Sequence, residues 1–260
     1  MYSKRQEEIR QYLSENKFAR IENLAELFHA SAETIRRDLM ELEKDSSIKR
    51  VRGGAMYSSL RAQEMEYEKR MENNQPEKRA IALLASEYIQ DGDALVMNNG
   101  TSNLELAEIL RRSSKSLTVV TNSPQIAILL NENKHHSVYL TSGYLRKHNR
   151  SLVGSICSDC LSYFKVDKAI VNIDGISMED GVTEYNTEEA AVIRKMLQIG
   201  HTRMVLCEYS KFNEVAFHKI CSMKEIDYVF TDWTMPPREM KAWKELGVKV
   251  LAAPPADEES

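Results

Sequence analysis

Hydrophobic residues in the first sixty positions recur at the three- and four-residue spacing of short amphipathic helices. The pattern predicts three helices, over residues 3 to about 15, 22–28 and 32 to about 44. Ile35, Leu39 and Leu42 form the apolar stripe of the third helix. Ser31 is a suitable N-cap for that helix, because its hydroxyl can accept a hydrogen bond from a free amide of the first turn.

A short basic segment follows the third helix. Ile48 to Val51 predicts a strand that turns at Gly53-Gly54, and residues 46–61 contain four basic residues and no acidic one. The whole chain has a net charge of −4, and residues 1–60 hold 11 Lys+Arg against 10 Asp+Glu, a net +1. Any attraction to nucleic acid must therefore be local. Three short helices followed by a cationic hairpin are typical of a winged helix-turn-helix.

In such a domain the early residues of the third helix and the hairpin contact DNA. The expected contacts are Ser31, Glu33, Thr34, Arg36, Arg37, Lys49, Arg50 and Arg52. Arg36 or Arg37 can bridge a guanine, while the hydroxyls hold phosphate oxygens. The alternative is a solvated face on which the arginines pair with neighbouring acids. Helix spacing, N-cap and hairpin together favour DNA binding.

Beyond residue 76 the pattern alternates between strands and helices. It predicts strands over 94–97, 117–120, 138–141, 168–172, 202–207, 228–231 and 248–252. Helices are expected over 77 to about 90, from the turn at 98–102 to 110, 124 to about 131, and 187–199. The expected fold class is α/β, with a mostly parallel sheet covered by helices on both faces. We expect a winged helix-turn-helix over 1–57, a linker over 58–75 and a sensor domain over 76–260.

Two polar loops follow predicted strands and open predicted helices: Gly100-Thr101-Ser102 and Thr121-Asn122-Ser123. Ligands of open α/β sheets bind at the carboxyl ends of the strands, and helix N-termini there hold anions. The alternative is that these side chains only cap their helices. Two such loops, with Lys211 after another strand, favour a phosphate-bearing ligand.

Both halves of the chain resemble the DeoR family of bacterial transcription regulators. The first half does so through Thr34-Ile-Arg-Arg-Asp-Leu39, Leu42-Glu43 and Arg50-Val-Arg-Gly-Gly-Ala55. The second half, from about 76 to 232, does so through Glu77-Lys78, Gly100-Thr-Ser102, Val120-Thr-Asn-Ser123, Gly143…Gly154, Asp174-Gly-Ile176, Gly181-Val-Thr183 and Ser210-Lys-Phe212. The resemblance implies a sensor domain similar to ribose-5-phosphate isomerase that binds phosphorylated sugars.

The resemblance also implies roles for individual residues. Gly100, Thr101 and Ser102 would cradle phosphate, Lys78 and Lys211 would supply charge, and Asn122, Gly143 and Asp174 would line the sugar end. Asn98, Thr121 and Ser123 complete the expected ligand-binding set. The chain departs from the family where Asn98-Asn99 replaces an acid before Gly100, where Glu208 replaces an aspartate, and where Ser142-Gly143 replaces a pair of glycines.

We therefore expect a cytoplasmic transcription regulator, a repressor of a carbohydrate operon, with double-stranded operator DNA and a phosphorylated sugar as its partners. Helix-turn-helix proteins dock on repeated half-sites, so a homodimer or higher oligomer is expected. No cofactor, metal site or membrane segment is expected, and the four cysteines, including the Cys157-x-x-Cys160 pair, do not suggest a disulfide scaffold.

Two alternatives remain. A sugar-phosphate isomerase-like enzyme would use Asp174, Glu188 or Glu189 as its base. However, Asp180-Gly-Val-Thr183 stands where the isomerase has a loop rich in lysine and glycine. An architectural DNA-binding protein without a ligand would show no change of melting temperature with any metabolite.

Overall fold

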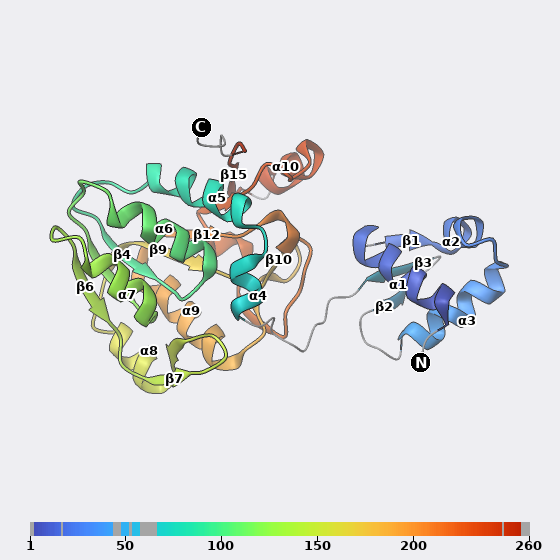
Figure 1. Cartoon of the computed structure of the whole chain (residues 1–260), viewed down its shortest axis with the longest axis horizontal. Helices are drawn as coiled ribbons and strands as arrows, with labels where there is room; N and C mark the ends of the chain where they lie inside the picture. The colour runs from blue at the N-terminus through green and yellow to red at the C-terminus, as the bar shows by residue number, and fades with distance from the viewer. Residues whose placement is uncertain are drawn as a thin grey trace. The chain divides into compact units, whose positions relative to one another are not determined.

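The computed structural model describes residues 3–16, 18–43, 48–51, 54–57, 67–245 and 247–255. The chain divides into two compact units, residues 1–62 and 63–260 (Figure 1). One apolar cluster fills the first unit and two fill the second. Each unit thus has the hydrophobic core of an independent domain.

The first unit contains the predicted helices and hairpin. Its elements are α1 (Lys4–Asn16), β1 (Phe18–Arg20), α2 (Ile21–Leu27), α3 (Ala32–Leu42), β2 (Ile48–Val51) and β3 (Gly54–Tyr57). The strands form an antiparallel sheet in the order β1-β3-β2. Ile35, Leu39 and Leu42, the stripe expected from the sequence, are fully buried against α1 and the sheet.

The turn between α2 and α3 fixes where α3 begins. His29 adopts a left-handed conformation with φ 48°, and Ser31 then caps α3 by accepting a hydrogen bond from Thr34 N at 3.1 Å. Asp38 lies on the buried side of α3, where its carboxylate accepts from Arg5 Nε at 2.6 Å and Gln6 Nε2 at 3.0 Å of α1. These contacts hold α3 against α1 with its opposite face exposed.

The second unit is built on seven strands. They are β4 (Ala94–Met97), β5 (Thr118–Thr121), β6 (Ser137–Leu140), β9 (Val166–Asn172), β12 (Gly200–Leu206), β14 (Tyr228–Thr231) and β15 (Lys249–Ala252). They form one parallel sheet in the order β15-β14-β12-β9-β4-β5-β6. The α/β class and the parallel sheet expected from the sequence are therefore confirmed.

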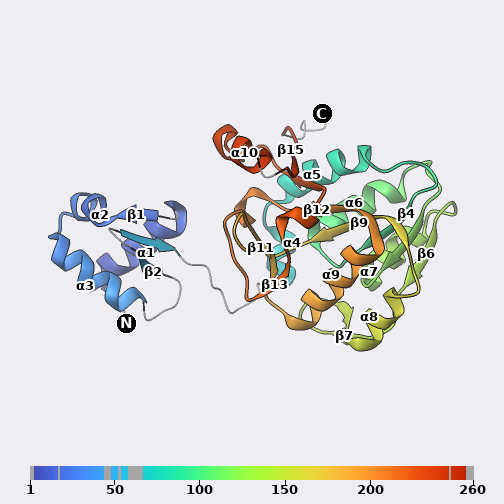
Figure 2. The ribbon, with the colours of Figure 1, turned by 180° about the vertical axis from the view of Figure 1, so that it is seen from behind.

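Alternate side chains of each strand enter two separate apolar layers, as the period of two in a strand requires. Leu95, Ile170 and Leu206 face a layer covered by α5 (Gln75–Glu87), α6 (Thr101–Arg111) and α7 (Pro124–Asn131). Val96 and Val205 face the other layer, which includes α8 (Ser155–Leu161), α9 (Thr187–Ile199) and α10 (Pro237–Lys244). Figures 1 and 2 show these two helical layers from opposite sides.

The strand order reverses between β4 and β9. From β4 the chain builds outward through β5 to β6, and from β9 it builds the other way to β15. The loops that leave β4 and β9 at their carboxyl ends therefore diverge, and a crevice opens at this point of an open α/β sheet. Asn98 follows β4 and Ile173 follows β9 at this position.

Several short elements were not expected from the sequence. β10 (Gly175–Ser177), β11 (Gly181–Glu184) and β13 (His218–Cys221) form a small antiparallel sheet, and β7 (Tyr144–Arg146) pairs with β8 (Ser151–Val153) in a hairpin. Strands of three or four residues contain too few side chains to show a clear alternation. For the same reason α8 and α10, of seven and eight residues, were not predicted.

The segment 58–75, expected as a linker, differs in its second half. Residues 58–66 lie outside the described residues, but α4 (Tyr67–Glu72) is a helix, and α5 begins at Gln75. Tyr67 is buried, and its hydroxyl donates to Gln125 Oε1 of α7 at 2.9 Å. One buried aromatic residue among polar neighbours is sufficient to anchor a short helix, but it leaves little periodic signal in the sequence.

Candidate functional site

The exposed face of α3 carries residues that were predicted from the sequence to contact DNA. Arg36 and Arg37 are exposed, and Ser31 and Thr34 lie at the start of the helix with their hydroxyls 2.8 Å apart. Glu33 is also exposed and accepts from Arg36 Nη1 at 3.1 Å. The intrahelical pairing considered as an alternative therefore occurs for Arg36.

Arg37 differs from Arg36 because Glu33, the acid one turn before it, is paired with Arg36, while Asp38 is held by α1. Among the residues that the structure describes, Arg37 makes no ion pair. Arg50 of β2 is paired with Glu43, with Nε 2.7 Å from Oε2 and its backbone N–H donating to Oε1 at 3.1 Å. Lys49 also belongs to β2, but Arg52 lies outside the described residues. Arg37 is thus the uncompensated cation on the exposed face of α3.

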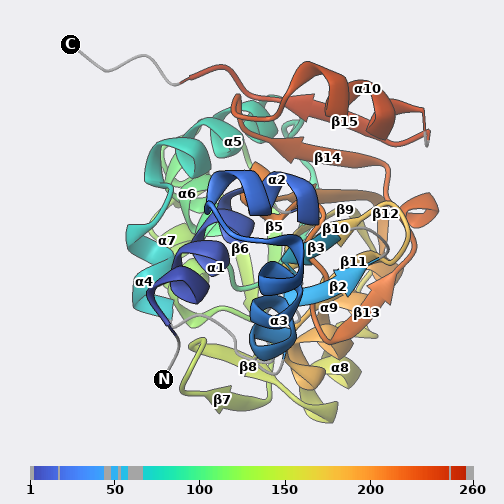
Figure 3. The same ribbon diagram turned by 90° about the vertical axis from the view of Figure 1, so that its right-hand side faces the viewer.

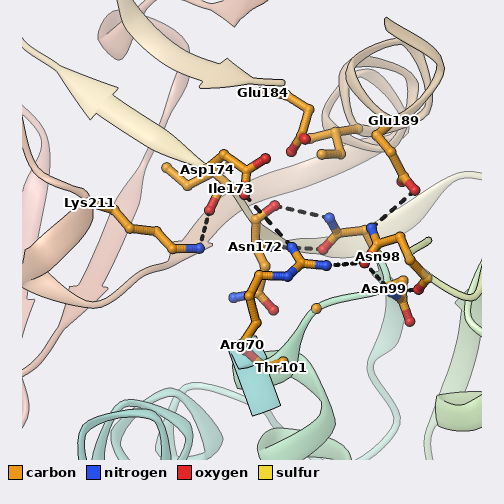
Figure 4. Close-up of a pocket in the computed structure, with 13 residues that line it drawn as sticks. Arg70, Asn98, Asn99, Thr101, Asn172, Ile173, Asp174, Glu184, Glu189 and Lys211 are labelled. Carbon is orange, nitrogen blue, oxygen red and sulfur yellow. Dashed lines mark hydrogen bonds and ion pairs between the residues drawn. The ribbon is translucent and has the colours of Figure 1, made fainter. Parts of the chain in front are cut away.

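The second unit contains a small polar pocket, open to solvent, at the point where the strand order reverses. Thirteen residues from six separate segments line it (Figure 4): Arg70, Asn98, Asn99, Gly100, Thr101, Asn149, Asn172, Ile173, Asp174, Glu184, Glu189, Ile193 and Lys211. Arg70 and Thr101 lie together on one side, and Glu184 and Glu189 lie on the opposite side. A ligand here would meet cations at one end and carboxyl groups at the other.

Buried asparagine amides link the strand ends beneath the pocket. Asn98 Nδ2 donates to Asn172 O at 2.9 Å, and Asn172 N donates back to Asn98 Oδ1 at 2.7 Å. Asn103 Nδ2 donates to the backbone oxygens of Asn98 and Ile170 at 3.0 Å. Asn99 Nδ2 reaches Asn149 O at 2.6 Å. Each amide supplies a donor and an acceptor, so the network satisfies buried backbone groups without adding charge.

The start of α6 lies on the pocket wall, and one of its first amides is bonded to β9. Asn103 N donates to Asn172 Oδ1 at 2.8 Å, which fixes the first turn of the helix against β9. A Cβ atom at Gly100 would lie 2.1 Å from that same Asn172 oxygen, so only glycine fits there. The first amides of a helix have no intrahelical acceptor, and they carry the positive end of the helix dipole. Thr101 begins α6 on the pocket wall, next to these amides.

The charged residues of the pocket are mutually paired. Lys211 Nζ donates to Ile173 O at 2.5 Å, and Arg70 Nη1 lies 3.8 Å from Asp174 Oδ1. Burial acts to raise the pKa of Asp174, but the hydrogen bond with Glu184 and the charges of Lys211 and Arg70 outweigh it, so the pKa is lowered.

The pocket brings together five of the eleven residues expected to bind ligand: Asn98, Gly100, Thr101, Asp174 and Lys211. Ser102 is buried in α6, and Thr121, Asn122 and Ser123 are buried behind the lining. Asn122 Oδ1 accepts from Asn99 N at 2.9 Å, and Ser123 Oγ donates to Asn99 Oδ1 at 2.7 Å while capping α7. The second loop therefore positions Asn99, and its serine caps a helix, as the alternative from the sequence proposed.

The other two expected residues lie farther from the lining. Lys78 is buried in α5, where its ammonium donates to the backbone oxygens of Arg70 and Asn73 and lies 3.6 Å from Glu208 Oε1. Burial lowers the pKa of Lys78. Gly143 has φ 138°, and a Cβ there would lie 2.6 Å from Val153 O. Lys78 thus secures α4 against α5, and Gly143 allows the chain to pass close to β8.

Sequence reasoning missed several residues that line the pocket. Arg70 comes from the segment expected to be a linker, and Asn149 comes from the β7–β8 turn. Glu189 Oε1 accepts from Asn149 Nδ2 at 3.1 Å and also from Ser151 Oγ. Asn172 had a local signal, since a polar residue at the end of a buried strand indicates a site at the sheet edge. Arg70 and Asn149 had none.

The described residues contain no helix that is both long and apolar enough to cross a bilayer. The four cysteines are free, and Cys157 and Cys160 do not form a disulfide. Within the described ranges, no group of three or more His, Cys, Asp or Glu side chains is arranged to hold a metal ion.

Comparisons with known proteins agree with this architecture. Residues 5–60 match the DeoR-like helix-turn-helix domain, and residues 73–233 match the DeoR C-terminal sensor domain. The HTH-type transcriptional repressor GlcR of Bacillus subtilis is 34% identical, over 85% of this chain and 84% of that protein. The putative aga operon transcriptional repressor of Escherichia coli O157:H7 is 30% identical, over 96% of this chain and 93% of its own length.

An uncharacterised HTH-type transcriptional regulator of Bacillus subtilis, YulB, is 30% identical over 98% of both chains. Among solved structures, ribose 5-phosphate isomerase A from Neisseria gonorrhoeae covers 53% of this chain at 14% identity with a TM-score of 0.40, a likeness too weak for functional inference. The family models and the named relatives describe regulators rather than enzymes. This chain belongs to the DeoR family of transcriptional regulators.

Proposed function

We propose that this protein is a cytoplasmic repressor of a carbohydrate-metabolism operon, released from its operator by a phosphorylated sugar. The observation that carries the proposal is the pocket where the strand order reverses, with Arg70, Lys211 and the start of α6 on its walls. Two relatives that align along most of this chain are named as repressors, one of them of the aga operon. These names support repression, and the polar pocket supports control by a small anionic metabolite.

On the DNA side, α3 enters the major groove and the β2–β3 hairpin lies against the neighbouring backbone. Arg37 can reach a guanine, because its guanidinium is exposed and Asp38 is held by α1. Arg36 and Arg50 contact phosphates, and DNA takes the place of Glu33 and Glu43 as partner of the two arginines. Lys49, on the same strand as Arg50, stays an expected phosphate contact. Helix-turn-helix proteins read two half-sites about one DNA turn apart, so we propose a homodimer.

On the effector side, the phosphate binds where Arg70, Thr101 and the first amides of α6 converge. Backbone amides at a helix start and an arginine fork are common phosphate partners. The hydroxyls of the sugar then lie toward Asn149, Glu184 and Glu189, which offer amide and carboxyl groups for hydrogen bonds. Carboxylates accept from neutral hydroxyls, whereas a second phosphate there would be repelled.

Arg70 links the pocket to the part of the chain that leads to the DNA-binding domain. It belongs to α4, the first described helix after the helix-turn-helix domain along the chain. Its guanidinium contacts Asn149 and Asp174, and its carbonyl oxygen accepts from Lys78. A phosphate that binds Arg70 competes with Asp174 for the guanidinium. Occupation of the pocket therefore changes how α4 is held.

Thermal-shift measurements with a panel of pentose and hexose phosphates test this proposal. A ligand at a hundredfold excess over its Kd stabilises the sensor domain by about 2.7 kcal/mol and raises its melting temperature. Arg70→Gln should abolish the shift with the same sugar phosphate, whereas Lys134→Gln, which replaces an exposed cation outside the pocket, should leave it unchanged.

Gel shifts with the DNA upstream of the protein's own coding sequence test DNA binding and its release by the effector. The sugar phosphate that raises the melting temperature should release the DNA from the wild type and not from Arg70→Gln. If no phosphorylated sugar changes the melting temperature, the effector is wrong and an architectural role without ligand becomes the better account. If binding to this DNA is negligible at both low and high salt, the DNA-binding proposal fails.

A further inference from the structure

The sensor domain exposes an unusual concentration of large apolar side chains at one end of its sheet. Among the residues that the structure describes, fourteen large hydrophobic side chains are exposed, and six of them lie between residues 139 and 163. We call these six the edge surface: Tyr139, Leu140, Tyr144, Leu145, Ile156 and Tyr163. Tyr163 is the most exposed of them, at 88%. Single exposed apolar residues are ordinary, but such a cluster marks an interaction site.

The edge surface is formed by neighbouring elements. Tyr139 and Leu140 belong to β6, Tyr144 and Leu145 to β7, and Ile156 to α8, which Tyr163 follows. The Tyr139 ring lies 5.5 Å from that of Phe164, and Thr141 Oγ1 lies 3.3 Å from Cys157 Sγ of α8. These contacts join the end of β6 to α8, and Figure 2 shows β6, α8 and β7 at the same end of the domain.

β6 is an edge strand without the usual protection. Its only partner among the described strands is β5. At the two ends of the pairing, the N–H of Ser137 donates to Leu117 O and the N–H of Thr141 donates to Thr121 O. The backbone groups of the alternate residues Val138 and Leu140 therefore point away from the sheet. Sheet edges usually carry lysine, proline or a bulge that prevents pairing. The sequence of β6, Ser-Val-Tyr-Leu, has no charged residue and no proline.

The opposite edge of the same sheet shows the contrast. β15 begins with the exposed Lys249 and is soon followed by Pro254 and Pro255. α10 packs beside it, as Figure 3 shows. Lysine, prolines and a covering helix are the features that keep an edge strand from pairing with another chain. One edge of the sheet is thus protected and the other is left open together with an apolar surface.

We propose that the edge surface is the interface through which a second copy of this chain binds, about a twofold axis at the β6 edge. This inference rests on the proposed function, because a regulator that reads two half-sites needs a second helix-turn-helix domain. The six side chains expose roughly 700 Å² if a large side chain has about 200 Å² in full. Tyr139 and Leu140 belong to opposite faces of the sheet, so this area surrounds the β6 edge on both sides. A standard interface buries about 800 Å² on each partner, which the six side chains approach before the open backbone of β6 is added.

A twofold axis also suits the chemistry of the edge. It places the same surface on both partners, so each apolar side chain meets an equivalent surface on the other copy. Two β6 strands related by such an axis run antiparallel, which allows the outward N–H and C=O groups of Val138 and Leu140 to pair across it. Both the apolar area and the open backbone groups are then covered by a single partner.

Sedimentation velocity of the full-length protein tests the interface. The wild type should be a dimer at micromolar concentration. The double variant Ile156→Asp/Tyr163→Asp should raise the dimer dissociation constant roughly 100-fold or more, because two charges on each partner would be buried within the contact. Phe217→Asp is the matched control, since Phe217 is 70% exposed but lies outside the edge surface. The circular dichroism spectrum should be that of the wild type for each variant.

Photocrosslinking keeps the test independent of charge substitutions. Benzoylphenylalanine in place of Tyr163 should give a covalent dimer on illumination, and the same group in place of Phe217 should not. A wild type that is monomeric, an aspartate double variant as dimeric as the wild type, or equal crosslinking at both positions overturns the interface. A dimeric protein that fails to bind its upstream DNA would refute the proposed function and leave the interface intact.

Discussion

The helix-turn-helix domain and the sensor domain place their polar functional groups in opposite ways. In the first, Arg36 and Arg37 lie on the exposed face of one helix, and the acids that decide their pairing, Glu33 and Asp38, belong to the same helix. In the second, the pocket draws on six separate segments, and most of its amides are already hydrogen-bonded. A surface that grips a partner can be encoded locally, whereas an enclosed pocket depends on long-range contacts.

The two domains also differ in how their functional residues contribute to folding stability. An exposed arginine on α3 can be replaced without loss of any buried contact, so its removal should affect binding and leave folding unchanged. An amide under the pocket satisfies several buried groups at once, and its removal leaves those groups without partners. Mutations on α3 should therefore change DNA affinity, whereas mutations beneath the pocket should change the stability of the sensor domain.

The largest effect is expected at Asn172. Asn172→Ala removes a side chain that accepts from Asn103 N at 2.8 Å and donates to Leu206 O at 2.7 Å. Buried groups left without partners cost about 1–3 kcal/mol each, so the sensor domain should lose about 3–5 kcal/mol of unfolding free energy. Urea unfolding followed by circular dichroism measures this loss. Asn131→Ala, at an exposed asparagine, is the control and should change little.

Arg37→Ala should weaken DNA binding without affecting stability. A guanine contact by arginine contributes about 1–3 kcal/mol, so affinity for the upstream DNA should fall roughly 5- to 150-fold at fixed salt. The melting temperature should stay that of the wild type. Arg36→Ala provides the comparison, because Arg36 is paired with Glu33 and should contribute less. Fluorescence anisotropy titrations that rank the two variants in the reverse order would assign the base contact to Arg36.

Ser31→Ala tests the local design of α3. The substitution removes the hydroxyl that accepts from Thr34 N at 3.1 Å, and loss of an N-cap costs about 1 kcal/mol. The loss should be confined to the helix-turn-helix domain, so hydrogen exchange should quicken in α3 and remain unchanged in the sensor domain. Ser31→Asp should retain most of the stability, since aspartate is also a good N-cap.

Glu43→Gln should have the smallest effect. It releases the Arg50 guanidinium from a carboxylate 2.7 Å away. If Arg50 then contacts a phosphate more fully, the slope of log affinity against log salt should become steeper by up to about 0.9. Gel shifts over a range of salt concentrations give the slope. A slope identical to that of the wild type would show that Arg50 already contacts phosphate at full strength or does not contact it.

The extent of prediction from sequence follows the same division. The strands 94–97 and 228–231 and the helix 187–199 have the predicted bounds, because each is an apolar run or stripe between polar ends. Ser31 caps α3 as expected, since capping needs only a hydroxyl three residues from an amide. These features depend on neighbours in the chain, which a sequence displays directly.

The pocket could be predicted only where a strand end carried a polar signal. Asn98, Gly100 and Asp174 follow buried strands, and all three line it. Ser123 had the same signal but faces inward, where it caps α7 and donates to Asn99, a residue 24 positions earlier in the chain. Arg70 reaches the pocket because Tyr67 and Lys78 hold α4 in place, and neither contact is visible as a pattern in the sequence.

The β7–β8 hairpin takes part in two sites. Its turn carries Asn149 into the pocket, and Arg146 lies 3.5 Å from Glu189, while Tyr144 and Leu145 belong to the edge surface. Under the proposed pairing, thermodynamic linkage makes the coupling reciprocal: whatever factor the metabolite applies to self-association, self-association applies to metabolite affinity. The metabolite level that half-saturates the protein then depends on the copy number of the regulator, so a cell that makes more of it also resets its threshold for response.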